Sequence, residues 1–214
     1  MNTCQLRTHF QSLYLLAVLE FLNMLLSLGA EARIEKFGNM IVKQRIAKSY
    51  RSKVLDEKIR RTRTRSEASM IIKARRIGIN APKILEISEY EIKMEFINGM
   101  LIKDIIDKNL SHEIGVCIEK LHNYGIIHGD LTTSNMILKD DKICFIDFGL
   151  SFSSKRIEDR AVDMHLLKQV IFSTHENPDM LWKEIARGYE DKKILKQIEN
   201  IEKRGRYAKK ILEI

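Results

Sequence analysis

Short apolar stretches that suit β-strands dominate the chain from residue 24 to residue 97. Their bounds are 24–28, 33–37, 40–45, 82–87 and 91–96. Gly38-Asn39 is a turn dipeptide between two of these strands, and Asn98-Gly99 ends the series. The pattern therefore predicts a small β-rich lobe near the start of the chain.

Helical periodicity interrupts the predicted strands once and dominates the chain after Gly99. Residues 56–76 have a helical pattern, which we expect as two helices broken near 62–64, with Gly78 as the C-terminal cap. The later helices are expected at 102–108, 111–124, 158–174, 178–190 and 192–212. The prediction is an α+β, bilobal fold with an N-lobe over 24–97 and a helical C-lobe over 98–214, and a ligand site in the cleft between them.

Between these helices lies a run of polar residues with a distinctive spacing, His128-Gly129-Asp130-Leu131-Thr132-Thr133-Ser134-Asn135. Asp147-Phe148-Gly149 follows, after the apolar residues 143–146. Phosphoryl transfer needs a carboxylate to orient the attacking hydroxyl or water, and oxygen ligands for magnesium. Any one Asp or Asn is more often a turn residue. The order and spacing together predict Asp130 as the catalytic carboxylate, and Asn135 and Asp147 as magnesium ligands.

Lys43 is a single cation in the apolar strand Ile41-Val42-Lys43. In a kinase-like lobe this lysine contacts the α- and β-phosphates of ATP, and a helix glutamate holds it in place. Glu67, at the start of an apolar helix face, has the right setting. The alternative is a surface lysine beside Arg45. With the two downstream motifs present, we predict that Lys43 is catalytic and that Lys43 and Glu67 belong to the ATP site.

Two further segments are expected to contact the nucleotide. Gly29, Ala30, Glu31 and Ala32 occupy the position of a phosphate-covering loop, although with one glycine in place of three. Met94, Glu95 and Ile97 fit a hinge whose backbone bonds an adenine edge; the alternative is an edge strand and linker. The loop alone is a weak signal, because few glycines leave few backbone N–H groups to hold phosphate.

Charge is concentrated in part of the chain. The formal net charge is +8, and residues 43–65 contain ten lysines and arginines against two acidic residues. A second basic stretch lies in the tail, at residues 203–210. Such clusters indicate a polyanionic partner such as RNA, or else a solvated helix face. The three cysteines, Cys4, Cys117 and Cys144, match no metal motif or disulfide framework, which suggests reduced thiols in a cytoplasmic protein.

Residues 1–23 form an N-terminal extension of uncertain status. The apolar run over 13–28 is interrupted by Glu20, Asn23 and Ser27, which makes it a poor membrane span, and no cleavage site of a signal peptide precedes it. We expect an extra helix or a misplaced start codon, and no membrane partner.

The segment after Gly149 is short, because the next helix is expected at Glu158. No Ala-Pro-Glu motif follows, and Thr132 stands where many protein kinases place a lysine. The predicted C-lobe therefore lacks the long activation segment that docks peptides.

Several motifs together resemble the small atypical kinase subunit of the KEOPS (EKC) complex, a relative of the RIO kinases, over about residues 25–207. The stretches that carry the resemblance are 29–32, Val42-Lys43, 48–51, Arg63-Thr64, Glu67-Ala68, 78–82, 127–135, 145–151, 158–163, 173–175 and 204–206. Residues 1–23 have no counterpart in the family pattern. The resemblance implies an Asp163 that accepts backbone hydrogen bonds from the catalytic loop.

The resemblance also implies a function. It implies ATP and Mg²⁺ as cofactors, ATPase and Ser/Thr kinase activity, and partnership with the threonylcarbamoyl-transferase and other KEOPS subunits. The complex makes threonylcarbamoyladenosine at position 37 of tRNAs that read codons beginning with adenine, so tRNA becomes the expected partner of the basic clusters. Two alternatives remain: a small-molecule kinase of the aminoglycoside or choline type, and a non-catalytic RNA-binding scaffold.

Overall fold

The structure is a computed structural model that describes residues 24–28 and 32–212, with side chains over 32–204. The predicted extension 1–23 lies outside the described residues. Contacts divide the chain into two units. The first contains the described residues up to Thr64 together with Ile84–Phe96, and the second contains Arg65–Lys83 and the residues from Ile97 onward. The expected linear lobes, 24–97 and 98–214, stay a prediction.

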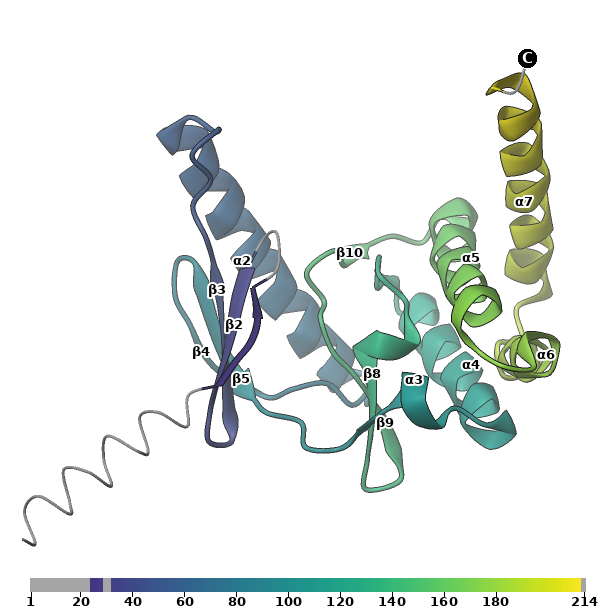
Figure 1. Cartoon of the computed structure of the whole chain (residues 1–214), viewed down its shortest axis with the longest axis horizontal. Coiled ribbons are helices and arrows are strands. Elements are labelled where there is room, and N and C mark those ends of the chain that lie inside the picture. The colour runs from purple at the N-terminus through teal and green to yellow at the C-terminus, as the bar shows by residue number, and fades with distance from the viewer. Residues whose placement is uncertain (1–23, 29–31, 213–214) are drawn as a thin grey trace, which may run out of the picture. The chain divides into compact units, whose positions relative to one another are not determined.

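The first unit is built on an antiparallel sheet (Figure 1). Its strands follow the spatial order β1-β2-β3-β5-β4. Their bounds are β1 Met24–Leu28, β2 Ala32–Phe37, β3 Met40–Arg45, β4 Ile84–Ile87 and β5 Glu91–Glu95. Gly38 makes the β2–β3 turn with a φ of 56°, a conformation that glycine adopts without strain. In β5, Ile92 and Met94 are buried while Glu91, Lys93 and Glu95 between and beside them are less so, as expected for a strand with one covered face.

Helix α2 spans Lys53–Arg76 without interruption, so the predicted break near residues 62–64 is wrong. Thr64 is 1% exposed, and its hydroxyl donates to the Arg60 carbonyl at 2.9 Å, one turn earlier. A threonine whose hydroxyl is satisfied by the preceding turn is tolerated inside a helix. Gly78 confirms the predicted cap: its φ is 78°, and its N–H bonds the Arg75 carbonyl at 3.0 Å.

The second unit is mainly helical and contains two small sheets, with strand orders β6-β8-β9 and β10-β7. Its helices are α3 Ile102–Ile105, α4 Lys108–Asn123, the 3₁₀ turn η1 Thr133–Asn135, α5 Ile157–Thr174, α6 Pro178–Gly188 and α7 Lys192–Leu212. Its strands are β6 Met100–Leu101, β7 Ile126–Ile127, β8 Met136–Lys139, β9 Lys142–Phe145 and β10 Phe152–Ser153. The predicted α+β composition, with a sheet in the first unit and mainly helices in the second, is confirmed.

Helix α4 begins earlier than the expected residue 111. Asp107 caps it, because its carboxylate accepts the Leu110 N–H at 2.8 Å. The helix then packs closely on α6. A side chain at Gly115 would collide with the Ile185 carbonyl, and one at Gly188 would collide with the His112 carbonyl. The two glycines therefore allow the two helix backbones to touch.

Helix α7 runs along α5, as Figure 1 shows. Ion pairs join the two helices: Lys168 to Glu202 at 2.7 Å and Glu158 to Arg204 at 2.7 Å. Within the described residues, no helix combines the length and apolar character needed to cross a membrane.

Candidate active site

The loop that follows β7 carries the first predicted motif. Its Gly129 has a φ of 79°, and a Cβ at this position would collide with the carbonyl oxygen of Leu150. Glycine is therefore required twice, by the backbone conformation and by the close approach of the neighbouring segment. Many protein kinases carry an arginine at this position, and the packing against Leu150 leaves no room for one in this chain.

Asp130 and Asn135 lie at the two ends of this loop and are directly bonded. The Asn135 Nδ2 donates to the Asp130 carboxylate at 2.9 Å and to its carbonyl at 3.0 Å. This bond fixes the orientation of the Asn135 amide, whose nitrogen is used by Asp130. The amide oxygen is then the atom with which Asn135 can bind a cation.

Asp147 directly follows the segment that leaves β9. The Ile146 N–H bonds the Asn135 carbonyl at 2.9 Å, which ties the residue before Asp147 to the loop of residues 128–135. Asp147 has a φ of 57°, unusual for a residue with a side chain, and its carboxylate accepts the Gly149 N–H at 3.2 Å. The structure thus brings Asp130, Asn135 and Asp147 together in the second unit.

Asp163 of α5 supports the loop, as the resemblance implied. Its carboxylate accepts the backbone N–H groups of His128 at 2.8 Å and Gly129 at 2.9 Å. It is 2% exposed and also contacts His122 Nε2 at 3.1 Å. Three hydrogen bonds to one buried carboxylate compensate the cost of burying its charge.

His128 orients the loop and does not have the setting of a proton carrier. It is 1% exposed, and its Nε2 donates to the Ile146 carbonyl at 3.1 Å. Its ring lies 4.9 Å from that of Phe148. Burial holds the pKa of His128 below its usual value of 6.5, although Asp163 acts in the opposite direction. The His128 imidazole is therefore uncharged at neutral pH. Its packing on Phe148 connects the loop of residues 128–135 with the Asp147-Phe148-Gly149 motif.

The predicted lysine and glutamate of the ATP site belong to different units. Lys43 lies in β3 and is 8% exposed, opposite Ile34 on one side and Ile92 on the other. Glu67 lies in the second half of α2 and is 2% exposed. Two charged side chains so deeply buried require partners, which is consistent with the predicted roles. Their mutual pairing stays a prediction.

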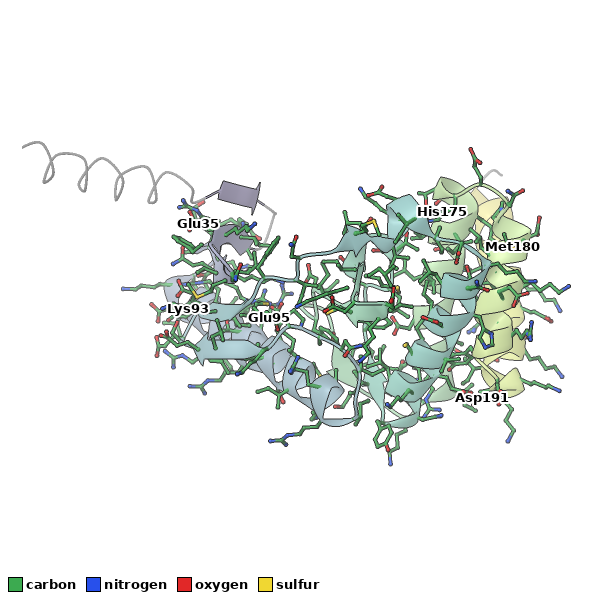
Figure 2. All side chains as sticks on the ribbon, turned by 90° about the horizontal axis from the view of Figure 1, so that it is seen from below. Glu35, Lys93, Glu95, His175, Met180 and Asp191 are labelled. Carbon is green, nitrogen blue, oxygen red and sulfur yellow. The ribbon has the colours of Figure 1, made fainter. Side chains whose placement is uncertain are left out.

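The structure describes four of the remaining nucleotide-site candidates, Ala32, Met94, Glu95 and Ile97, and their contacts with a nucleotide stay predictions. Met94 is buried in β5, and Glu95 ends this strand (Figure 2). Ile97 is buried at the point where the chain passes from the first unit to the second. Ala32 is buried at the start of β2, while Gly29, Ala30 and Glu31 lie outside the described residues.

The candidate metal ligands, Asn135 and Asp147, suit magnesium better than they suit a metal that is bound by protein side chains alone. Within residues 32–204 no three His, Cys, Asp or Glu side chains cluster as a metal site. Magnesium is usually bound by one or two carboxylates together with substrate phosphates and water. The Asn135 amide oxygen and the Asp147 carboxylate offer hard oxygen ligands of this kind.

Two residues of this network were not predicted from the sequence. The Tyr189 hydroxyl lies 2.8 Å from His122 Nδ1, and His122 Nε2 in turn contacts Asp163. Burial raises the pKa of Tyr189, so its hydroxyl keeps its proton and donates to His122. The available signal was a histidine on the apolar face of α4, beside Ile118 and Leu121.

This fold and this loop define the class of protein kinase-like phosphotransferases. The RIO domain profile matches residues 31–167. The Rio2 kinase–ADP/Mg²⁺-phosphoaspartate complex from Chaetomium thermophilum has a similar fold, with a TM-score of 0.59 and 16% identity, over 85% of this chain and 70% of that one.

Curated relatives with higher sequence identity identify the family within this class. A probable serine/threonine-protein kinase BUD32 homolog of Archaeoglobus fulgidus is 39% identical, over 86% of this chain and 96% of its own. The KEOPS complex subunit Bud32 of Pyrococcus abyssi is 40% identical, over 87% and 97% of the two chains. The chain therefore belongs to the Bud32 family of atypical, RIO-type serine/threonine protein kinases, which confirms the resemblance.

A longer relative is also similar. A probable bifunctional tRNA threonylcarbamoyladenosine biosynthesis protein of Methanosarcina acetivorans is 45% identical over 79% of this chain. The chain spans 32% of that protein's length.

Proposed function

We propose that this chain is an ATP- and magnesium-dependent kinase and ATPase that serves a KEOPS complex in the cytoplasm. Its output would support threonylcarbamoyladenosine formation at position 37 of tRNAs that read codons beginning with adenine. The hydrogen bond between Asn135 and Asp130, within a loop tied to the residue before Asp147, is the observation that carries the chemistry. The names of the Bud32 relatives support the biological setting.

In this proposal each residue of the loop has a separate task. Asp130 orients the attacking hydroxyl or water, while Asn135 holds its carboxylate in place. Asn135 and Asp147 would hold magnesium, which neutralises charge on the phosphates. Lys43, supported by Glu67, would contact the α- and β-phosphates, residues 29–32 would cover them, and the 94–97 backbone would bond the base. Asp163 keeps the loop in position.

The short segment between Gly149 and α5 bears on the choice of substrate. Only residues 150–156 separate them, and Phe152–Ser153 of β10 pairs with β7. A segment that is short and bound to a sheet offers little surface for docking a peptide. This favours ATP turnover linked to partner subunits, the threonylcarbamoyl-transferase and others, over the phosphorylation of many proteins.

The test is magnesium-dependent ATP turnover by the purified chain, alone and with the transferase subunit and tRNA. Asp147→Ala should abolish turnover, while circular dichroism shows an intact fold. Asp141→Ala, at an exposed position of the β8–β9 turn, is the matched control and should retain it. Undiminished turnover by Asp147→Ala would refute the assigned site. Turnover that neither the partner nor tRNA changes would refute the proposed setting.

A further inference from the structure

A basic cavity lies in the first unit, where β3 leads into α2. It has a volume of about 110 Å³ and is lined by Arg45, Lys48, Tyr50, Arg51, Arg60 and Arg63, among others. Pockets for whole nucleotides or drug-sized molecules are several times larger. The volume and the five cationic side chains suit one tetrahedral oxyanion such as a phosphate group.

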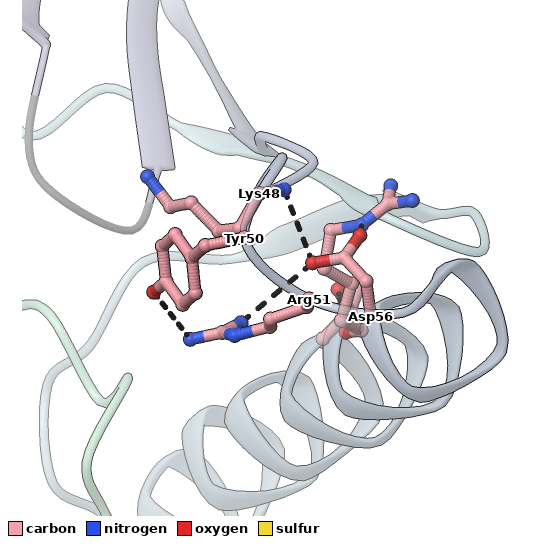
Figure 3. A network of polar contacts seen from close by, with 6 residues as sticks. Lys48, Tyr50, Arg51 and Asp56 are labelled. Atoms are coloured by element: carbon pink, nitrogen blue, oxygen red, sulfur yellow. Dashed lines mark hydrogen bonds and ion pairs between the residues drawn. The ribbon is translucent and has the colours of Figure 1, made fainter.

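Asp56 holds the cavity in shape. It is 3% exposed, accepts the Arg60 Nε–H at 2.6 Å and the Lys48 backbone N–H at 3.2 Å, and lies 3.7 Å from Arg51 Nη1 (Figure 3). Burial alone would raise the pKa of Asp56, but these hydrogen bonds outweigh it and lower the pKa. The carboxylate thus stays charged and positions two arginines at the cavity wall.

A second contact fixes Arg60. Its guanidinium carbon lies 3.9 Å from the centre of the Tyr90 ring. The group is therefore held between a carboxylate and an aromatic ring. A positioned arginine loses less side-chain entropy when it binds a phosphate than a mobile surface arginine does.

Tyr50 adds a different chemistry to the same cavity. The residue is 77% exposed although it lines the cavity. The Arg51 Nη2 donates to its hydroxyl at 3.1 Å, and the guanidinium carbon lies 5.2 Å from the ring centre. An exposed tyrosine steadied by an arginine offers a flat surface on which a nucleobase can stack.

We propose that this cavity binds one nucleotide of unpaired RNA, with the phosphate among Lys48, Arg51 and Arg60 and the base stacked on Tyr50. The choice of RNA rests on the proposed function in tRNA modification, while the pairing of phosphate and base rests on the cavity itself. A phosphorylated peptide would use the cations but has no need of the stacking surface. A duplex would reach the cations but keeps its bases stacked inside.

The test measures binding of a fluorescent single-stranded RNA dodecamer to the full chain by anisotropy, without ATP. Tyr50→Ala should weaken binding about tenfold, and Tyr50→Phe should leave it nearly unchanged because the ring remains. Tyr124→Ala is the matched control, since Tyr124 is 64% exposed and lies in the second unit. Duplex RNA of the same sequence should bind Tyr50→Ala and the unmodified chain alike. Unchanged single-strand affinity in Tyr50→Ala would overturn the proposal.

A second pair of variants tests the proposed contact between the cavity and the RNA phosphate. Lys48→Gln should reduce the slope of log affinity against log salt by about 0.7, as expected for one contact to a single strand. Lys58→Gln removes the same charge from an exposed position of α2 that does not line the cavity, and should change the slope less. Equal effects of the two variants would assign the cations to a general basic surface and overturn the cavity. A phosphoserine peptide that displaces the RNA more effectively than a dinucleotide would also overturn the proposal.

The outcome of the RNA-binding assay is independent of the outcome of the ATP-turnover assay, because the binding assay contains no ATP. A chain that binds RNA through Tyr50 yet hydrolyses no ATP would refute the proposed function alone. A chain that hydrolyses ATP but binds RNA equally well without Tyr50 and Lys48 would refute this inference alone.

Discussion

The Asp163 carboxylate accepts the backbone N–H of Gly129 at 2.9 Å, although 34 residues separate them in the chain. This bond anchors the residue immediately before Asp130. The position of Asp130, the predicted catalytic carboxylate, is therefore set from α5 as well as by Asn135. Support of this kind lets a loop hold a reactive group without the rigidity of a helix or strand.

Replacement of the anchor should affect both stability and turnover. The N–H groups of His128 and Gly129 donate to different oxygens of Asp163. In Asp163→Asn one of these oxygens becomes an amide nitrogen, which cannot accept a hydrogen bond, so one of the two N–H groups loses its partner. We expect a loss of about 3 kcal/mol in the free energy of unfolding, and a fall in kcat that exceeds any change in KM. Urea denaturation and steady-state kinetics measure the two effects. Glu176→Gln, an exposed change of the same kind, should alter neither. An Asp163→Asn protein with normal stability would contradict the anchoring role.

Gly129→Ala should lower both stability and ATP turnover. The left-handed backbone alone costs about 1–2 kcal/mol with a Cβ, and the collision with the Leu150 carbonyl adds to this. Gly38→Ala separates the two causes, because Gly38 has a φ of 56° and no atom lies within 4 Å of the place that its Cβ would take. Thermal unfolding should therefore show a larger loss at Gly129. Equal losses would show that the close approach to Leu150 has no energetic consequence.

Tyr189→Phe tests the buried chain of hydrogen bonds behind Asp163. The change keeps the ring but leaves His122 Nδ1 without its donor in the core, which should cost about 1–2 kcal/mol. Denaturant unfolding measures this cost. Tyr124→Phe removes a hydroxyl from a side chain that is 64% exposed and should be neutral. The bond from Tyr189 to His122 carries no stability if both variants unfold alike.

Acid should destabilise the protein through His128. Because burial lowers the pKa of His128 below 6.5, the unfolded chain takes up a proton below that pH while the folded chain does not. The free energy of unfolding therefore falls as the pH drops from 6.5 towards the folded pKa, by at most about 1.4 kcal/mol per pH unit for one proton. Burial lowers the pKa of His175 too, which adds in the same direction.

The contribution of His128 can be isolated by His128→Phe, which keeps a ring beside Phe148 but cannot titrate. Urea unfolding between about pH 7 and pH 5 should give a shallower dependence for this variant than for the unmodified chain. Parallel curves would exclude His128 as a source of the acid sensitivity.

The sequence predicted local elements well where periodicity and turn residues agree. The five strands, the Gly78 cap and the bounds of α7 are confirmed. The break predicted in α2 is wrong because the Thr64 hydroxyl donates to the Arg60 carbonyl in the preceding turn. Helix propensity treats threonine as unfavourable and takes no account of such a bond. Helix α4 begins before the expected residue 111 because the Asp107 carboxylate caps it by accepting the Leu110 N–H. The sequence offered possible helix starts at both positions, and the wrong one was chosen.

In the candidate site too, features set by local sequence could be predicted, and features set by packing between distant segments could not. The contact between Asp130 and Asn135 could be anticipated because the two residues are only five positions apart, whereas the catalytic and magnesium-binding roles of Asp130, Asn135 and Asp147 stay predictions. The contact of Tyr189 could not be anticipated, since its partner His122 lies 67 residues away and only the packing of the second unit joins them. The need for glycine at position 129 likewise depends on Leu150, whose approach no local pattern reveals.

Helix α2 has a consequence for how this protein can be inherited. The first unit is not continuous in sequence: it ends at Thr64 in the middle of α2 and resumes at Ile84, while Arg65–Lys83 belongs to the second unit. A recombination crossover between Thr64 and Phe96 would therefore divide a unit that needs both pieces. No single crossover can separate the first unit from the second, because each unit is made of two stretches of the chain.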